Sequence, residues 1–398
     1  MSAQNNFNHL PNLSSLILGA QVVYATDEWF AEGENLLKGE EPVWDETKFT
    51  VYGKWMDGWE SRRKRTEGYD WCIIKLNIPG EVHSFEVDTC HFTGNYSPMV
   101  SIQACYMSEE MESTKKLLSL RKADRDSRED GRMGLCATAE ENALVADLDS
   151  ENWPTLVPLS PLKAGYEDTR RSHFDIDTSV HNQKVNYIRL NMGPDGGIAR
   201  LKTYGVVKPD VASIPADREI DLVSVEMGGL AIDCSNQHFG HPRNLLAPGR
   251  GECMGDGWET ARQPLRPACY KRQADGLMLL PGQDWALIKC GLRGTVRRLE
   301  IDTHFFKGNY PESCLIEGCL LPPCAESEEK AALESVEWKP ILARTRLGPD
   351  AIHHFSVENQ SGMSDIGVIS HLRLTILPDG GIMRVRAFGL KEQQHSRL

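Results

Sequence analysis

Two carboxylates and a cluster of basic residues fall within one short segment of the sequence. Asp57 and Glu60 stand in the sequence Asp-Gly-Trp-Glu, and basic residues fill positions 62–65. Arg62 and Arg63 are suited to hold a carboxylate through paired hydrogen bonds, while a neighbouring Asp or Glu moves protons. The segment therefore predicts a site for a small anionic molecule. The alternative interpretation is a solvated charged loop, because most such charge runs are exposed.

The same segment occurs a second time. Asp256 and Glu259 again enclose Gly-Trp, and Arg262 follows. A flexible surface loop has no need to repeat Trp and Gly at fixed spacing, so the recurrence favours a binding or catalytic role.

A second candidate cluster follows a short run typical of a strand. Asp88 and His91 leave the end of this run close together and are followed by Gly-Asn-Tyr, which contains Asn95 and Tyr96. The pair suits acid–base chemistry or metal ligation. Alternatively, Asp88 caps backbone N–H groups in a loop and His91 is merely hydrogen-bonded.

The later copy of this cluster differs at one position. It contains Asp302 and Asn309, but Phe305 stands in the register position of His91 and a histidine comes one place earlier. If the imidazole matters, the two copies are not equivalent.

These segments belong to a tandem duplication that covers most of the chain. Five blocks recur in the same order, which indicates duplication with insertions and deletions rather than chance. The recurring pairs are Asn35-Leu36-Leu37 with Asn244-Leu245-Leu246, Asp57–Glu60 with Asp256–Glu259, Asp70-Trp71 with Asp284-Trp285, Gly94-Asn95-Tyr96 with Gly308-Asn309-Tyr310, and Pro194–Gly197 with Pro378–Gly381.

The hydrophobic patterns within each copy are typical of strands. Apolar and polar residues alternate before the first Pro-Asp-Gly-Gly turn and after the second, which predicts hairpins with one face in water. Short apolar runs at 72–74 and 286–288 predict central strands. Gly and Pro between short strands favour an all-β fold, a jelly-roll β-sandwich in each half.

The domain boundaries follow from the repeats. We expect a first domain over 1–206, a linker over 207–221, a second domain over 222–390 and a polar tail over 391–398. The first copy is longer between its Gly-Asn-Tyr and Pro-Asp-Gly-Gly blocks, near 108–141, where Glu, Lys, Arg and Asp are frequent. This composition predicts an exposed insertion, partly helical or disordered.

Composition excludes several classes of protein. The chain has 398 residues, with 44 Lys and Arg against 57 Asp and Glu, and a net charge of −13. Such an acidic balance works against binding a nucleic-acid backbone. No apolar run is long enough to span a membrane, and the start lacks the pattern of a signal peptide. The 11 cysteines are therefore expected to be free thiols in a reducing compartment, and no spacing suits structural zinc.

The repeated blocks resemble those of the allantoicase family. The resemblance rests on Leu18-Gly19-Ala20, 25–30, Glu34–Leu37, 53–60 and 91–96, and it extends from about Leu18 to Gly389. It implies two jelly-roll, galactose-binding-like domains, homo-oligomers, and hydrolysis of allantoate to ureidoglycolate and urea in purine breakdown.

The resemblance also gives the candidate residues roles. It implies proton transfer by Asp57, Glu60, Asp88 or His91, binding of the substrate carboxylate by Arg62, Arg63 and Arg262, and hydrogen bonding by Asn95 and Tyr96. Asp256, Glu259, Asp302 and Asn309 are the matching substrate-binding candidates of the second copy. Oxygen ligands such as Asp88 are compatible with a divalent metal, but no cofactor is required.

Two departures from the family pattern leave an alternative function open. Phe305 replaces the expected histidine, and Arg262-Gln263-Pro264 replaces a longer basic run. A catalytically silent descendant that binds a ureido acid or carbohydrate is the alternative to an active enzyme, and a structural oligomer is a weaker third. The chain ends in Ser396-Arg397-Leu398, a variant of the peroxisomal Ser-Lys-Leu signal, so we expect a peroxisomal location, or otherwise a cytoplasmic one.

Overall fold

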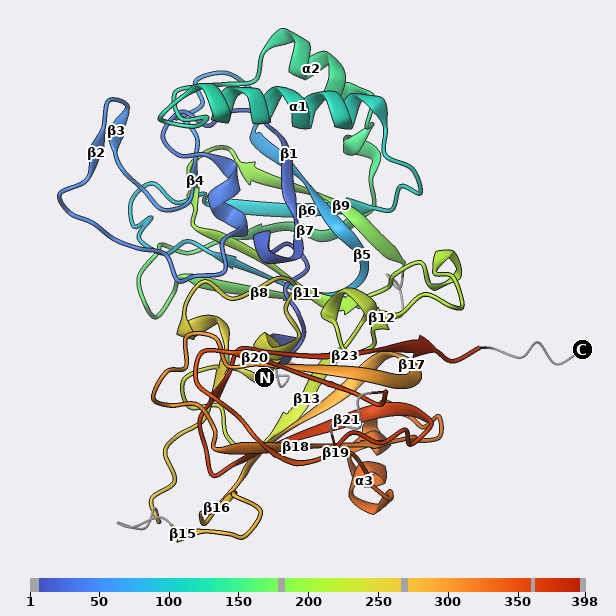
Figure 1. Ribbon diagram of the computed structural model, residues 1–398. Coiled ribbons are helices and arrows are strands. Elements are labelled where there is room, and N and C mark those ends of the chain that lie inside the picture. Colours follow the sequence, from blue (N-terminus) through green and yellow to red (C-terminus); the bar gives the residue numbers. More distant parts are fainter. Residues whose placement is uncertain (1–6, 178–182, 266–270, 359–361, 394–398) are drawn as a thin grey trace, which may run out of the picture. The chain divides into compact units, whose positions relative to one another are not determined.

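The computed structural model describes residues 7–177, 183–265, 271–358 and 362–393. The chain folds as two domains, Met1–Lys208 and Pro209–Leu398 (Figure 1). The segment expected to be a linker contains the short helix η5 (Val211–Ser213) and strand β12 (Ile220–Asp221). Because β12 pairs with β23 (Arg384–Lys391), it is part of the second domain's sheet.

The first domain is built mainly of strands. They are β1 (Gln21–Ala25), β2 (Phe49–Thr50), β3 (Gly53–Lys54), β4 (Trp59–Glu60), β5 (Asp70–Asp88), β6 (Met99–Cys105), β7 (Thr155–Pro161), β8 (Arg171–Asp175), β9 (Lys184–Gly193), β10 (Gly197–Ile198) and β11 (Arg200–Val207). The helices are α1 (Glu112–Ser127), α2 (Ala139–Ala146) and the short helices η1 (Phe7–His9), η2 (Leu16–Leu18), η3 (Gly33–Leu37) and η4 (Ser150–Asn152).

The second domain repeats this order with small differences. Its strands after β12 are β13 (Leu230–Cys234), β14 (Trp258–Glu259), β15 (Lys271–Arg272), β16 (Met278–Leu279), β17 (Asp284–Asp302), β18 (Ser313–Cys319), β19 (Lys339–Arg346), β20 (Ile352–Ser356), β21 (Val368–Leu377), β22 (Gly381–Ile382) and β23. Its helices are α3 (Glu326–Ser335), η6 (Val225–Met227), η7 (Pro242–Leu246) and η8 (Met254–Asp256).

In each domain one long strand pairs with strands of both layers of the sandwich. The first half of β5 pairs with β1 and β9, a register irregularity follows between Lys75 and Gly80, and the second half pairs with β11 and β8. Strand β17 does the same with β13, β21, β23 and β20. The irregularity lets a single strand pass from one layer to the other. The predicted all-β fold of two tandem jelly-roll sandwiches is confirmed.

The core explains the short apolar runs. Cys72, Ile73 and Ile74 on β5 are all fully buried, because one face points into the sandwich and the other lies under helices. Ile73 belongs to a cluster with Leu117 of α1 and Val145 of α2, which cover this sheet in Figure 1. The prediction of a central strand is therefore confirmed for this run.

The predicted hairpins are wrong. β9 pairs with β5 and β6, whereas β11 pairs with β5 alone, so the strands on either side of the Pro-Asp-Gly-Gly turn do not pair with each other. Between them β10 pairs with β4 and carries the chain from one layer to the other. The face expected to be wet is buried as well, since Arg189, Asn191 and Arg384 are at most 5% exposed.

The charged insertion of the first domain is helical in part, but it is not simply exposed. Arg121 on α1 binds the carboxylates of Glu28 and Glu34, and Arg132 binds Glu28 and Glu141, and all of these side chains are buried. The charge-rich composition did not reveal this network, because Glu28 and Glu34 lie 87 to 104 residues before the arginines that bind them.

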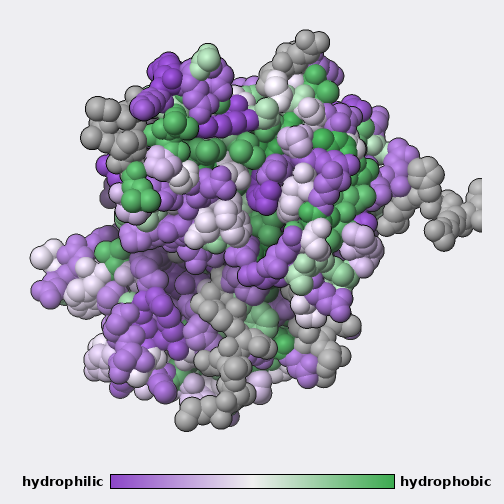
Figure 2. Space-filling model, turned by 90° about the horizontal axis from the view of Figure 1, so that it is seen from below, coloured by the Kyte–Doolittle hydropathy of each residue, from purple (hydrophilic) through white to green (hydrophobic). Residues whose placement is uncertain are grey.

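The surface visible in Figure 2 is mostly hydrophilic, with smaller hydrophobic areas between. Within the described ranges, no helix has the length and apolar character needed to cross a membrane.

Candidate active site

The carboxylate of Glu60 lies at the centre of the candidate site. Glu60 is on β4, whose backbone pairs with Gly197 of β10 on one side and Ala31 on the other. Its side chain is 8% exposed, and its Oε1 accepts a hydrogen bond from Asn95 Nδ2 at 2.7 Å. Burial raises the pKa of Glu60 to about 7, because the Asn95 hydrogen bond offsets it only in part. A carboxyl group with this pKa both donates and accepts protons near neutral pH.

The second domain contains the same pair of residues. Glu259 on β14 accepts a hydrogen bond from Asn309 Nδ2, and its backbone pairs with Gly381 of β22. Glu259 is only half-buried. The duplication therefore kept the hydrogen bond, but the carboxyl is buried only in the first copy.

The turns beside these carboxylates require glycine. A Cβ atom on Gly197 would lie 2.1 Å from the ring of Phe92, and one on Gly381 would lie 2.0 Å from the ring of Phe306. Both aromatic rings are fully buried. The repeated Pro-Asp-Gly-Gly block therefore serves close packing beneath the Glu–Asn pair. Tyr96 packs in the same cluster as Phe92 and bridges to Gly197.

Asp57, one of the predicted proton-transfer residues, is held in ion pairs. Its carboxylate binds Arg200 Nη2 at 2.7 Å and Lys38 Nζ at 3.0 Å, and it accepts the N–H of Val43. Burial alone would raise the pKa of Asp57, but these hydrogen bonds outweigh it and lower the pKa. A carboxylate so engaged is a poor proton donor, and the contacts favour a structural role.

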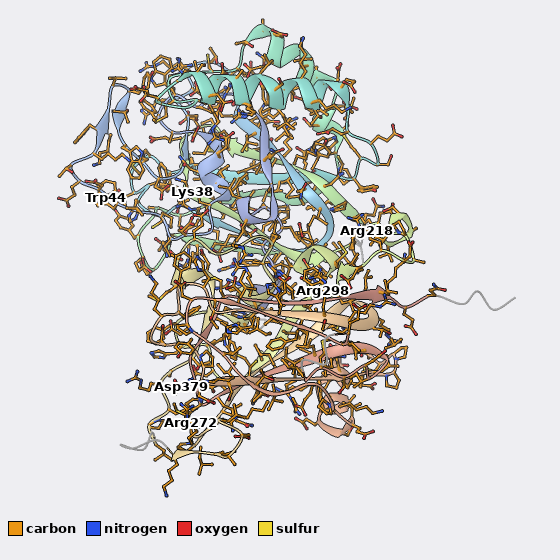
Figure 3. All side chains as sticks on the ribbon, viewed as in Figure 1. Lys38, Trp44, Arg218, Arg272, Arg298 and Asp379 are labelled. Carbon is orange, nitrogen blue, oxygen red and sulfur yellow. The ribbon has the colours of Figure 1, made fainter. Side chains whose placement is uncertain are left out.

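Asp88 and His91 both lie near the loop of residues 38–44, whose ends Lys38 and Trp44 are labelled in Figure 3, because Arg170 binds both Asp88 and Glu41 and His91 contacts Pro42. Asp88 binds Arg170 Nη1 at 2.9 Å and caps the N–H of Cys90, and its burial raises the pKa. His91 Nε2 lies 3.1 Å from the carbonyl oxygen of Pro42. The structure thus gathers both residues near the loop with partners of their own, and it brings neither into contact with Glu60.

The predicted anion-binding arginines do not converge. Arg62 binds Asp27 through Nε at 2.7 Å and stacks over Trp29. Arg63 and Arg262 are exposed, without an interaction partner in the part of the chain that the structure describes. Neither reaches the Glu–Asn pair of its domain through a hydrogen bond or ion pair within the described residues.

The remaining second-copy candidates cap backbone groups. Asp256 accepts the N–H groups of Glu252 and Cys253, and Asp302 accepts the N–H of His304 while Arg250 lies 3.6 Å away. Phe305 has φ 66° and His91 has φ 68°, so both occupy the left-handed region at the same place in the repeat. The two residues therefore share one backbone position and differ in chemistry.

Sequence reasoning missed the arginines that hold the acids. Arg200 pairs with Asp57 and Arg170 pairs with Asp88, and neither stands near its partner in the sequence. A signal existed for the first, because Arg200 and Arg384 both come three residues after the end of a Pro-Asp-Gly-Gly block. In the described parts of the chain, no group of three or more His, Cys, Asp or Glu side chains is placed to hold a metal ion.

Comparisons with known proteins agree with this duplicated architecture. The family model "Allantoicase repeat" matches residues 11–208 and 220–392. A probable allantoicase of Photobacterium profundum is 35% identical over 389 residues, which is 98% of each chain. One from Pseudomonas aeruginosa is 36% identical over 383 residues, 96% of each chain.

A solved structure agrees with the sequence relatives. The crystal structure of allantoicase from Saccharomyces cerevisiae superimposes with a TM-score of 0.67 at 32% identity, over 95% of this chain and 92% of that one. Since both repeats match the family model and the relatives align over nearly the whole length, this chain belongs to the allantoicase family.

Proposed function

We propose that the chain hydrolyses allantoate to ureidoglycolate and urea in purine degradation, with Glu60 as the proton-transfer residue. Family membership supplies the reaction. The observation that carries the assignment is the Glu60 carboxyl. It is buried, Asn95 is its one side-chain partner among the described residues, and its pKa is raised to about 7.

The chemistry requires one proton to be given and one to be taken. Allantoate carries a carboxylate and two ureido groups on one carbon. Breaking one carbon–nitrogen bond releases urea only if its nitrogen is protonated, and the water that forms the new carbon–oxygen bond must lose a proton. Neutral Glu60 would give the first proton, and the resulting carboxylate would take the second, which restores the acid. Asn95 would hold the carboxyl in place through its hydrogen bond.

Urea release from allantoate by the purified full-length protein tests this proposal. We expect turnover by the unaltered chain and a kcat lower by a factor of about 10² to 10⁴ for Glu60→Gln, because an amide cannot exchange the proton. Glu259→Gln is the matched control, since it alters the same hydrogen bond in the other repeat, and we expect less than a tenfold loss. Equal losses for both variants, or none for Glu60→Gln, would contradict the assignment.

The same assay separates the enzyme from a silent ligand-binding descendant. Folded protein that binds allantoate or a carbohydrate but releases no urea would establish the descendant. Assays with added Mn²⁺ and after chelation would test whether turnover requires a divalent metal. Turnover only with metal would indicate that Asp88 and His91 are metal ligands.

Location and assembly are further proposals. We infer delivery to peroxisomes from Ser396-Arg397-Leu398, which lies outside the described residues, and homo-oligomers from the family resemblance. An extra residue after Leu398 should abolish peroxisomal import, and light scattering should give a mass above 44.6 kDa. Unchanged distribution or a monomer mass would remove the respective proposal.

A further inference from the structure

A buried arginine of the second domain lacks hydrogen-bond partners, among the described residues, for two of its three nitrogens. Arg384, on β23, is 2% exposed. Its Nη1 donates to the carbonyl oxygens of Asp256 and Met383, but Nε and Nη2 have no hydrogen-bond partner among the described residues. Nε and Nη2 form the side edge of the guanidinium, which binds a carboxylate through two parallel hydrogen bonds. Buried donors left without a partner are destabilising, so an acceptor bound at Nε and Nη2 would stabilise the protein.

A cavity of about 220 Å³ adjoins this arginine. Besides Arg384, its wall includes Arg250, Arg386, Glu300, Asp302 and Ile352. The three arginines outnumber the two carboxylates, so the wall favours an anion of low charge. Burial, together with the neighbouring Arg386, lowers the pKa of Arg384 to about 10, which is the effect expected of a cation that lacks its counter-ion.

The first domain shows what normally faces this edge. Arg200 occupies the place of Arg384, and its Nη2 binds the Asp57 carboxylate at 2.7 Å while its Nε donates to the carbonyl of Glu40. In the second domain the equivalent Asp256 points its carboxylate to the N–H groups of Glu252 and Cys253 instead. The loop before Asp256 is shorter than the loop before Asp57, because the hairpin β2–β3 has no counterpart there. The second domain therefore keeps the arginine, Arg384, but the carboxylate of Asp256 does not pair with it.

The surrounding charges have also been exchanged. Glu41 of the first domain binds Arg170 and Arg171, whereas Arg250 stands in its place in the second domain and Ile352 pairs with Asp302 at the register position of Arg171. Arg250 has a side chain 63% exposed and lies 3.6 Å from Asp302. At this position the first domain thus has the carboxylate of Glu41, while the second domain has the guanidinium of Arg250.

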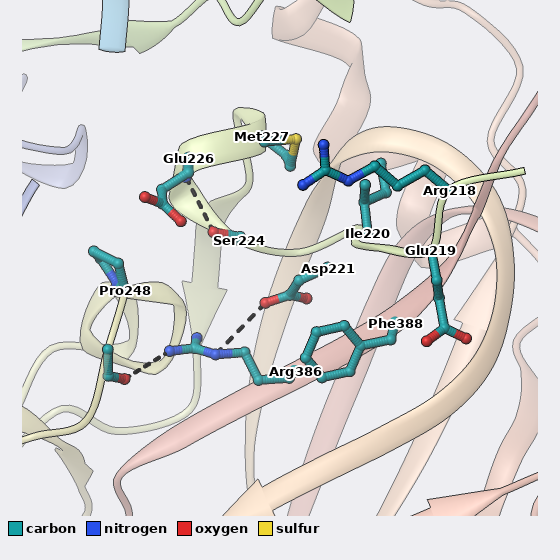
Figure 4. A pocket seen from close by; sticks show the side chains of 11 residues that line it. Arg218, Glu219, Ile220, Asp221, Ser224, Glu226, Met227, Pro248, Arg386 and Phe388 are labelled. Carbon is teal, nitrogen blue, oxygen red and sulfur yellow. Dashed lines mark hydrogen bonds and ion pairs between the residues drawn. The ribbon is translucent and has the colours of Figure 1, made fainter. Parts of the chain in front are cut away.

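The cavity continues along the same strand. A second cavity of about 320 Å³ shares Gly249 and Arg386 with the first and reaches Phe388. In Figure 4 the Arg386 guanidinium extends toward Asp221, whose carboxylate lies 3.6 Å from Nε. Its Nη2 donates to the carbonyl oxygen of Gly249 at 3.0 Å. Because side chains alternate along a strand, Arg384, Arg386 and Phe388 share one face of β23. There is room on this face for a ligand that extends beyond its carboxylate.

We propose that this face of the second domain binds a small monocarboxylate, held by the side edge of Arg384 and drawn in by Arg250. Glu300 and Asp302 accept N–H groups of the ligand, so a carboxylate that carries a ureido group is preferred to acetate. This site goes beyond the proposed function, and it does not depend on Glu60.

Methionine methyl NMR on the full-length protein gives a local test. Met383 contacts Arg384, with Sδ 3.3 Å from Nη1, and Met56 lies in the core of the first domain. Sodium acetate and N-carbamoylglycine are the probes. We expect a saturable shift of the Met383 methyl signal with both, at lower concentration for N-carbamoylglycine, and acetate should leave Met56 unmoved.

Variants connect the shift to the cavity. Arg250→Glu should weaken binding at least tenfold, because it puts a carboxylate where the anion enters, and its exposed position keeps the fold. Arg384→Lys keeps the charge but lacks the two-donor edge, and it should weaken binding similarly. Arg272→Glu, an equal charge change on the exposed strand β15, is the control and should bind normally.

Three outcomes would overturn the proposal. They are no saturable Met383 shift with either probe, equal binding by the Arg250→Glu variant, and an equal shift with phosphate or chloride. A protein that releases no urea but passes these tests would still have the site, so this proposal and the proposed function fail independently.

Discussion

The two domains share a backbone design and differ in how they treat their charges. Trp59 and Trp258 both donate Nε1–H to a backbone carbonyl, of Asp27 and Asn236 respectively. The N–H groups of Lys64 and Gln263 both bind the Asp of the Pro-Asp-Gly-Gly turn. Contacts that fix the backbone were therefore kept through the duplication, whereas the side-chain ion pairs around them were not.

The difference is greatest under the helices of the first domain. Glu28 is fully buried between Arg121 and Arg132, and burial would raise its pKa, but the two arginines lower it to about 2. Gln237 holds the equivalent place in the second domain and is exposed. The stability of the first domain therefore depends on the arginines that pair with Glu28, whereas the second domain has no buried carboxylate at this position.

Removing that carboxylate should have the largest effect on stability. Glu28→Ala leaves Arg121 and Arg132 buried without their shared partner, so we expect the first domain to lose about 3 to 5 kcal/mol of unfolding free energy. Hydrogen exchange of β5 amides during denaturant titration measures it. Gln237→Ala is the matched control and should change β17 by about 0.5 kcal/mol or less. Similar losses in both domains would mean that the network is not the cause.

Removing the Asp of the Asp-Gly-Trp-Glu block should likewise destabilise the first domain more than the second. Asp57→Ala strands the buried Arg200, and we expect a loss of about 3 kcal/mol. Asp256→Ala removes only two hydrogen bonds to exposed backbone N–H groups, so we expect about 1 kcal/mol. The midpoints of chemical unfolding, read separately for β5 and β17, compare the two. A larger loss from Asp256→Ala would show that its carboxylate does reach Arg384 in solution.

These contrasts show where the sequence was informative. Repeated blocks such as Asp-Gly-Trp-Glu and Pro-Asp-Gly-Gly predicted two similar sandwiches, because backbone turns and buried rings constrain residues locally. Alternating patterns misjudged Arg189 and Arg384, since a buried arginine has the same place in the pattern as an exposed one. The partner that decides burial, such as Asp57 for Arg200, lies far away in the chain and becomes visible only after folding.

The candidate site was predictable in part for the same reason. Glu60 and Asn95 were both selected from repeated blocks, and the structure brings them together. Asp57, Asp88 and His91 were selected from the sequence with equal reason. In the structure, however, cations or backbone groups already bind these side chains. No pattern within the sequence distinguishes a free buried acid from a paired one.

The pH dependence of stability should distinguish Glu60 from Glu259. Glu60 keeps its proton up to about pH 7 in the folded state but loses it near pH 4.5 when unfolded, so the folded state binds more protons between these values. Stability should therefore fall as pH rises through this window, by about 3 kcal/mol in total. Glu60→Gln should remove the fall, whereas Glu259→Gln should leave it. Calorimetry from about pH 4 to pH 8 measures it, and a pH-independent difference between wild type and Glu60→Gln would refute the raised pKa.

The smallest expected effect comes from moving one ion pair between the domains. Lys64 Nζ binds Asp70 at 2.9 Å, whereas the equivalent Gln263 reaches Asp284 only at 3.4 Å. Gln263→Lys should stabilise the second domain by about 0.5 to 1 kcal/mol. Asp284 is buried, but the new lysine would remain partly exposed to water, which limits the gain. The gain should fall in about 1 M salt, because screening weakens a partly exposed pair. Gln263→Met, of similar size but uncharged, should give no gain. A gain shared by the Met variant or indifferent to salt would come from packing, and the domains would then differ at this position by shape rather than by charge.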